Sequence, residues 1–568
     1  MDEPADVAQQ VSTRPQPSPD SPPPVPQIAA LLAASALTAC GGGSSSGPSS
    51  SSPAAPPPTT ARPASANDGA RFLTQATLGF SRADLDALMR SGSYGDWLNT
   101  QFALPRSQSH FDWLMAKGYG DSANINNTQG MDNTLWRKLI ASPDALRQRV
   151  VLALSELCVV SVLGINGPWR QFAVASYLDI LEANAFGNYR QLLGQISLSP
   201  AMGYYLTFRG NVKANPATGS QPDENYAREL MQLFTIGLLQ LNADGSAQTT
   251  ETYKQADVSG LARVFTGWDL DTSGLTTPYP PDVMRRPMVQ VANRYESGSK
   301  TFLGVTIAAG ASATDSLNTA LDTLFNHPNL PIFVGRQMIQ RLVTSNPSPA
   351  YVTRVAAAFA NNGSGVRGDM KALLTAILLD PEARDGAVAA QPGFGKLREP
   401  VVRLLNWARA YGAASVSDTW ALGDLSDPGT RLGQSPMRSP SVFNFFRPGY
   451  VPPDTALSAQ GMVGPEFQIT SEVSVAGYVN YMQQVIGAST TADLRADYSS
   501  LQSLAGDAAK LLAEINLVLA AGALSAATLA QIQGAVDSVK PSSPAALQNR
   551  INIALTLVLA APEYIAQK

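Results

Sequence analysis

The segment at residues 222–237 constrains the fold of this chain more than any other part of its sequence. It opens with proline and aspartate, which suit the start of a helix, and it closes with a glycine, which suits a helix end. Leu230, Leu233 and Phe234 recur at the spacing of one apolar stripe. Four charged side chains crowd its first half: Asp223, Glu224, Arg228 and Glu229. We therefore expect one helix that packs against a core and carries either a site or an ion-pair clamp near its start.

The same periodicity predicts further helices at residues 82–90, 144–163, 169–185, 190–198, 249–265, 313–325, 331–342, 349–361, 368–379, 400–413, 505–521, 525–539 and 543–560. Residues 300–307 favour a strand instead. The sequence thus predicts an all-α fold, one helical unit at residues 68–568 with at most a small β element. A division into two lobes near residues 270–310 stays open. Loops at 269–300 and 421–465 exceed ordinary connection lengths, which predicts function or packing over a cleft.

The N-terminal residues have the pattern of a bacterial lipoprotein precursor. An apolar run at residues 28–40 is too short to span a bilayer but suits a signal peptide, and it ends in the lipobox-like string Leu-Thr-Ala-Cys at Cys40. Residues 40–67, rich in serine, proline and glycine, predict a disordered tether. The acidic start departs from this pattern. We expect removal of residues 1–39, lipidation of Cys40 and an exported protein anchored in the cell envelope, with Gly41 favouring the outer membrane.

The scarcity of histidine and cysteine argues against several classes of enzyme. The chain has two of each, too few mature ligands for a zinc site built from these residues. No Gly-x-Ser-x-Gly elbow follows an expected strand, and no phosphate loop or dinucleotide fingerprint follows one either. His327 precedes Pro328 at an expected helix start, where we expect a structural hydrogen bond, and Cys158 lies in an apolar run that predicts a buried, inert thiol. The sequence identifies no cofactor and no metal site.

Carboxylates remain as candidates for chemistry. Glu224 and Arg228 are four residues apart, and Asn225 and Glu229 form a second such pair about 100° around the helix. The two glutamates could act as acid and base, or bind a hard cation through oxygen. In the alternative interpretation, Arg228 neutralises Glu224 while Glu229 pairs elsewhere, so that the group clamps helices together. The sequence leaves both interpretations open.

Further polar residues lie in apolar surroundings and are expected to face the same centre. We take four of them as candidate ligand-binding residues: Asn225, Asp257, Arg263 and Glu156. Each residue alone more often belongs to a solvated face or a helix cap. Together they predict a polar seam inside a helical bundle.

Several uncommon strings, in order along the chain, carry a resemblance to a known family. They are RFLTQATLGF (71–80), AFGNYR (185–190), PDENYARELMQLFTIGL (222–238), QADV (255–258), LARVFTGW (261–268), PSVFNFFRPG (440–449) and PEYI (562–565). With them, the chain resembles the bacterial domain of unknown function 1800 family over roughly residues 68–568. One departure is Tyr295-Glu296, where many relatives have His-Asp before the Gly-x-Lys element that ends here at Lys300.

The resemblance implies a largely helical secreted or surface protein but no reaction. It also implies a partner, because the family is commonly encoded beside a second exported family, domain of unknown function 1501. A net charge of −4 offers no basic excess for a phosphate backbone, so nucleic acid is not an expected partner.

Two functions are compatible with these observations. The first is a lipid-anchored extracytoplasmic binding or assembly module that works with the exported partner and contacts the membrane through its anchor. The second is a carboxylate-dependent hydrolase of envelope or secreted polymer. In that case Glu224 and Glu229 would be the acid and base, and Arg228 would orient one of them.

Overall fold

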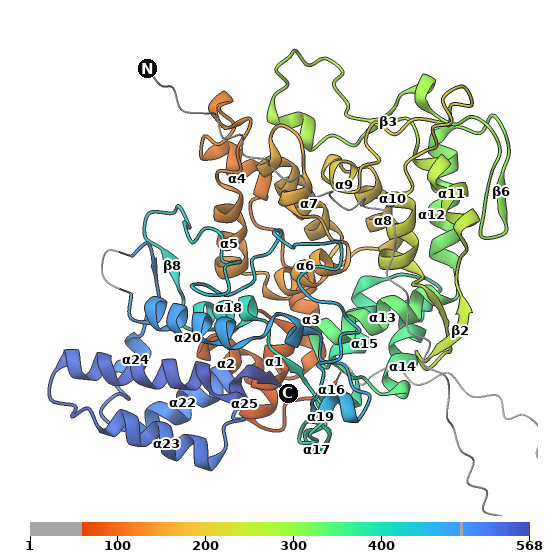
Figure 1. Ribbon diagram of the computed structural model, residues 1–568. Coiled ribbons are helices and arrows are strands. Elements are labelled where there is room, and N and C mark those ends of the chain that lie inside the picture. Colours follow the sequence, from red (N-terminus) through yellow and green to blue (C-terminus); the bar gives the residue numbers. More distant parts are fainter. Residues whose placement is uncertain (1–59, 489–491) are drawn as a thin grey trace, which may run out of the picture. The chain divides into compact units, whose positions relative to one another are not determined.

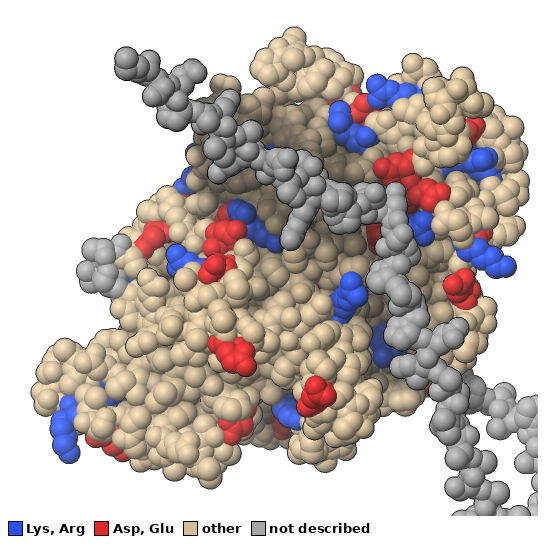
Figure 2. All heavy atoms as spheres, in the orientation of Figure 1, with Lys and Arg blue, Asp and Glu red and all other residues tan. Residues whose placement is uncertain are grey.

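The computed structural model describes residues 60–488 and 492–568, and helices dominate this part of the chain (Figure 1). The strands among these residues are short and pair only in two-stranded antiparallel sheets. The predicted all-α class is therefore confirmed. No described helix is both long enough and apolar enough to cross a membrane. On the face shown in Figure 2, basic and acidic side chains are interspersed on a largely uncharged surface.

The helices of the first half are α1 (Ala66–Ala76), α2 (Arg82–Ser91), α3 (Tyr94–Ala103), α4 (His110–Ala116), α5 (Met131–Ala141), α6 (Ala145–Leu157), α7 (Arg170–Asn184), α8 (Tyr189–Ser197), α9 (Pro200–Tyr205), α10 (Asn225–Glu229) and α11 (Gln255–Ala262). Those of the second half are α12 (Ala313–Asn326), α13 (Asn329–Leu342), α14 (Pro349–Ala360), α15 (Met370–Leu378), α16 (Pro381–Arg384), α17 (Gly386–Ala389), α18 (Pro400–Ala410), α19 (Ala456–Ala459), α20 (Glu472–Ile486), α21 (Ser499–Gln502), α22 (Ala508–Ala520), α23 (Ala526–Asp537), α24 (Pro544–Ala560) and α25 (Pro562–Ile565).

The strand pairs are β1 (Leu239–Leu241) with β2 (Ala247–Glu251), β3 (Trp268–Asp269) with β4 (Val289–Gln290), β5 (Lys300–Phe302) with β6 (Val305–Ile307), β7 (Lys396–Leu397) with β10 (Ala566–Gln567), and β8 (Ala414–Ser415) with β9 (Leu494–Arg495). The last two pairs join segments that are far apart in sequence. They tie the C-terminal helices to the middle of the chain.

Helices α6 and α7 form the centre of the core. Every residue of α6 from Leu146 to Leu157 is buried, as expected of a helix that is enclosed on all sides. Helix α7 packs against α4, α5, α6, α8 and α9. Figure 1 also shows α22, α23 and α24 packed side by side. The described residues belong to one compact unit.

Local signals located several helices well. Ser81 makes the N-cap of α2, with Asp84 completing a capping box. The predicted helix at 249–265 is wrong in its first part, because residues 247–251 form β2 and only residues 255–262 are α-helical. Threonines in this stretch favour an extended chain, and a tight turn at residues 242–246 returns it against β1.

The predicted strand at 300–307 is a hairpin of β5 and β6. Leu303 and Gly304 between them both have positive φ, at 48° and 76°, which the tight hairpin turn requires. The predicted helix at 222–237 also differs in detail. Helix α10 starts after Glu224 and continues as a π-helical turn at Leu230–Thr235, before Gly237 ends it at φ 71°. The wider turn places Leu230, Met231 and Phe234 all in the core.

Close backbone approach makes Gly260 a test of this packing. A Cβ at Gly260 of α11 would lie 1.8 Å from the carbonyl oxygen of Thr301 in β5. We expect Gly260→Ala to lower the free energy of unfolding by about 2 kcal/mol or more, because the backbones must separate. The control is Gly534→Ala in α23, where no atom lies within 4 Å of the added Cβ. That variant should gain about 0.5–1 kcal/mol. Urea unfolding measures both, and equal effects would contradict the packing described.

Candidate functional site

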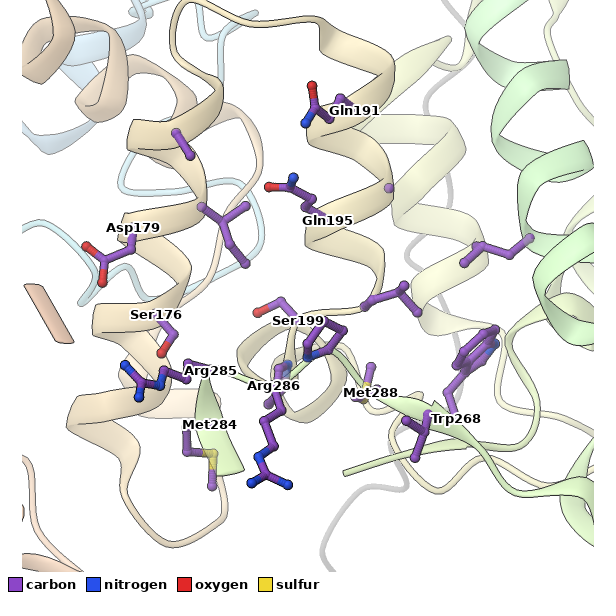
Figure 3. A pocket seen from close by; sticks show the side chains of 18 of the residues that line it. Ser176, Asp179, Gln191, Gln195, Ser199, Trp268, Met284, Arg285, Arg286 and Met288 are labelled. Carbon is purple, nitrogen blue, oxygen red and sulfur yellow. The ribbon is translucent and has the colours of Figure 1, made fainter. Parts of the chain in front are cut away.

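A cleft of about 830 Å³ opens between α4, α7, α8 and α12. The segment from Met284 to Gln290 also lines the cleft and lies within the long loop at 269–300, for which the sequence predicts function or packing over a cleft. Figure 3 shows α7 and α8 on opposite sides of the gap with this segment below them. The volume falls within the range of sites that hold small molecules.

Most of the cleft lining is apolar. Helix α12 contributes Leu317 and Leu321, and the loop segment contributes Met284 and Met288. Trp268 of β3 adds an aromatic ring. The loop segment is fixed in place, because β4 pairs with β3 and the Met288 amide donates to the Leu198 carbonyl at 2.8 Å. The cleft is therefore preformed rather than covered by a loose lid.

Two buried serines give the cleft an unsatisfied polar end. Ser176 of α7 is 5 % exposed and Ser199, at the N-cap of α9, is 2 % exposed. Neither hydroxyl has a hydrogen-bond partner among the described residues, although a serine at an N-cap commonly bonds to the helix backbone. Figure 3 shows both side chains at the same end of the gap between α7 and α8. A buried hydroxyl usually finds a partner, so this end of the cleft suits a polar ligand group.

Asp179 lines the cleft but holds the fold together. One carboxylate oxygen accepts the backbone N–H of His110 at 2.8 Å, and the other accepts that of Phe111 at 3.1 Å. These bonds tie the start of α4 to α7. Burial raises the pKa of Asp179, while His110 and the two amides oppose that rise. With both oxygens engaged, Asp179 positions the cleft wall.

Behind this wall, Glu182 joins three side chains. Lys138 lies 2.7 Å from one carboxylate oxygen, while Gln148 and His110 approach the other at 3.0 and 3.4 Å. Burial opposes ionisation, but His110 and Lys138 outweigh it and hold the pKa of Glu182 at about 2. His110 also lies 3.2 Å from the hydroxyl of Thr134. The series Thr134, His110 and Glu182 has the same types of group as a hydrolase triad. It cannot act as one, because Thr134 and His110 are both buried and out of reach of a substrate.

The two glutamates predicted as an acid and base pair, Glu224 and Glu229, lie in different environments. Glu224 accepts from Arg228 at 3.2 Å, from Gln255 at 2.7 Å and from Ser259 at 2.6 Å. Arg228 also donates to Gln255 at 3.0 Å. These four side chains join α10 to α11, as the clamp interpretation describes for Glu224.

Glu229 lies apart from that network. It is 8 % exposed, and its Oε2 atom has no hydrogen-bond partner among the described residues. Burial raises the pKa of Glu229, and Arg228 only partly offsets the rise. The backbone N–H of Asn225 donates to the Asp223 carboxylate at 2.8 Å. None of Glu224, Asn225, Arg228 and Glu229 lines the cleft.

Asp257 and Arg263 contact the β5–β6 hairpin. Asp257 accepts from the Lys254 and Leu303 amides at 2.8 and 2.7 Å, and exposed Arg263 donates to the Ser299 carbonyl at 3.4 Å. Glu156 belongs to a different, fully buried charged cluster. Its partners there are Arg341 and Glu399. The structure thus places Asp257 on the helix that contacts Glu224, but it does not bring Glu156 to them.

The remaining predictions concern single residues. Cys158 is buried, as predicted, and burial raises the pKa of its thiol to about 12. The Nδ1 atom of His327 accepts the Asn329 amide at 3.1 Å, which confirms its structural role. Cys40 lies outside the described residues. Among the described residues, no three His, Cys, Asp or Glu side chains are grouped as a metal site.

Sequence reasoning missed Ser176 and Ser199. Serines are common, and nothing in the local sequence shows whether a hydroxyl will find a partner. The length of the loop at 269–300 was the one usable signal for the cleft.

Comparison with known proteins places the chain in context. A family model described as "Protein of unknown function (DUF1800)" matches residues 71–566. No curated protein and no solved structure matches the chain.

The unpaired Glu229 carboxyl predicts a pH-dependent stability difference. Because its pKa is raised by folding, its contribution to stability is complete below the pKa of the unfolded chain and is lost as pH rises through the folded pKa. Glu229→Gln keeps the shape of the side chain and cannot ionise. We expect the melting temperature of the variant, relative to the wild type, to rise by on the order of a degree between pH 5 and pH 8. Glu224→Gln is the control, and an equal trend in both variants would contradict the assignment.

Proposed function

The chain belongs to the DUF1800 family, whose description states no function, and we propose that it is a lipid-anchored extracytoplasmic binding protein. Its ligand would occupy the cleft between α7, α8, α12 and the 284–290 segment. The observation that carries the proposal is the combination of a preformed apolar cleft with the two partnerless hydroxyls of Ser176 and Ser199. Concave, mainly apolar sites with a few convergent polar groups are typical of small-molecule binding.

The location in this proposal rests on the N-terminal sequence. A lipid on Cys40 and the predicted tether between it and the start of α1 at Ala66 would hold the helical unit near a membrane surface, while leaving it free to meet other envelope components. The exported protein of the domain of unknown function 1501 family is the proposed partner. Binding and assembly would then be two parts of one role at the envelope.

The hydrolase alternative has less support. All three hydrogen bonds to Glu224 come from neighbouring side chains of α10 and α11, which leaves it engaged in packing. Glu229 has the raised pKa of a general acid, but it does not line the cleft. A substrate in the cleft would therefore not meet either carboxyl group.

Filling the cleft should remove binding of an apolar molecule. The uncharged fluorophore N-phenyl-1-naphthylamine is the probe, because its emission rises in apolar surroundings. Ala183 is an exposed residue of α7 that lines the cleft, so Ala183→Trp would occupy the space without entering the core. We expect Ala183→Trp to weaken probe binding about tenfold or more. Fluorescence titration gives the dissociation constant.

The matched control is Ala527→Trp, at an exposed position of α23. It should bind the probe as the wild type does. Absence of binding to the wild type, or equal affinity of both tryptophan variants, would refute the cleft as the binding site.

Anchoring is tested separately in cells. We expect Cys40→Ser to move most of the protein from the membrane fraction to the soluble fraction, because the acyl chains can no longer be attached. Cys158→Ala is the matched control, since its thiol is buried in the core. Fractionation followed by immunoblotting measures the distribution, and a membrane-bound Cys40→Ser protein would contradict lipid anchoring.

A further inference from the structure

We propose that the cleft selects an uncharged ligand with one hydrogen-bonding end and an apolar body. The polar end would bond to Ser176 and Ser199, and the body would lie against Met284, Met288 and the leucines of α12. This inference rests on the proposed function, namely that the cleft is a binding site. It adds the chemical class of the ligand.

The charges that line the cleft already have partners. Five charged residues line it: Asp112, Asp179, Arg190, Arg285 and Arg286. On α8, the Arg190 guanidinium lies 2.6 Å from Asp322, and it also donates to the Asn318 side chain at 3.2 Å. Arg190 therefore offers little free attraction to an anionic ligand.

Arg285 and Arg286 are held in the same way. Arg285 stacks over the Phe111 ring at 4.5 Å and pairs with Asp112 at 3.4 Å and with Asp282 at 2.5 Å. Arg286 donates to the Ser273 carbonyl at 2.8 Å and lies 3.7 Å from Asp271. Figure 3 shows the Arg286 side chain directed away from the gap between α7 and α8. Each arginine is thus neutralised by a carboxylate.

Asp179 does not offer a free negative charge either. Its two oxygens accept the His110 and Phe111 amides, so a cationic ligand would compete with bonds that hold α4 to α7. A charged group on the ligand, of either sign, would lose its hydration on entering the cleft and would find no free opposite charge there. That transfer is costly, whereas an uncharged group needs only hydrogen bonds.

The serine hydroxyls at the polar end of the cleft can form hydrogen bonds with an uncharged polar group of the ligand. Each serine hydroxyl can donate one hydrogen bond and accept others, so the pair suits an alcohol, amide or ester. Ser176 lies on α7 and Ser199 precedes α9, so the ligand group would bridge two separate elements. Gln195 extends from α8 into the same gap (Figure 3), with its carbonyl oxygen already accepting from Asn184 at 2.7 Å.

The apolar body has a wall that can adapt to its shape. The unbranched side chains of Met284 and Met288 adjust to different apolar partners. Leu317, Leu321 and Trp268 complete the surface. A cleft of about 830 Å³ has room for a flexible hydrocarbon chain.

A competition experiment tests the class of ligand. Decanol, decanoate and decyltrimethylammonium share a hydrocarbon chain and differ in head group, and each is used at neutral pH to displace N-phenyl-1-naphthylamine from the wild-type protein. We expect decanol to displace the probe at concentrations about tenfold or more below those of the two charged compounds. Equal or stronger displacement by decanoate or decyltrimethylammonium would overturn the inference.

The serines are tested with a double variant. Ser176→Ala with Ser199→Ala should raise the decanol concentration needed for displacement about tenfold, because the hydroxyl partners are lost. The displacement is referred to the variant's own affinity for the probe, and its melting temperature, which should stay near the wild-type value, is the internal control. An unchanged response to decanol would overturn the role of the serines.

The two levels of the proposal fail in different ways. A wild-type protein that binds the probe in the cleft but shows no head-group preference overturns only the ligand class. A wild-type protein that does not bind the probe, or binds it equally after Ala183→Trp, overturns the binding function and with it this inference.

Discussion

The fold depends on a group of buried charges that must satisfy one another. The cluster consists of Arg149 and Glu156 of α6, Arg341 of α13, Lys396 of β7, Glu399 before α18, and Glu466 of the 3-10 helix Pro465–Ile469. Burial, together with the nearby charge of Glu399, raises the pKa of Glu156. For Glu399, the charge of Lys396 opposes burial, and the pKa is lowered. Arg149 and Lys396 also bond to the Arg341 carbonyl near the end of α13. Because removing any partner would leave a buried charge, segments from across the chain are held in one arrangement.

This arrangement positions the cleft through α6 and α7. The cluster fixes α6, and α6 packs along α7, which supplies the cleft wall. Glu182 and Asp179 of α7 are satisfied by α4, α5 and α6, while Ser176 on the same helix is left without a partner. Among the polar side chains that line the cleft, Asp179 has both oxygens engaged, whereas the hydroxyls of Ser176 and Ser199 have no partner among the described residues. That contrast is the physical reason for assigning the binding role to the cleft.

The polar seam expected from the sequence exists as several separate groups. Glu224 and Arg228 join α10 to α11, Asp257 anchors the β5–β6 hairpin, and Glu156 lies in the central cluster. Sequence reasoning identified these residues as unusual because charges are sparse in apolar segments. It could not separate them into groups, because a spacing along one helix does not state which other helix lies opposite. The same limit explains why Glu224 and Glu229 look like an acid pair in sequence yet occupy different environments.

What the sequence determined by itself is local. The apolar periodicity predicts the helices, and the length of the loop at 269–300 predicts function or packing over a cleft. These features depend on neighbours within a few residues, or on chain length alone. Tertiary structure decided the rest. The cleft combines residues from Ser109 to Leu321, and whether Ser176 has a partner depends on every element packed around it. The extended β2 and the π-helical turn after Glu229 were likewise decided by pairing and packing. Hydrogen bonding between distant segments is a property of the folded chain, so it leaves no signal at a single position.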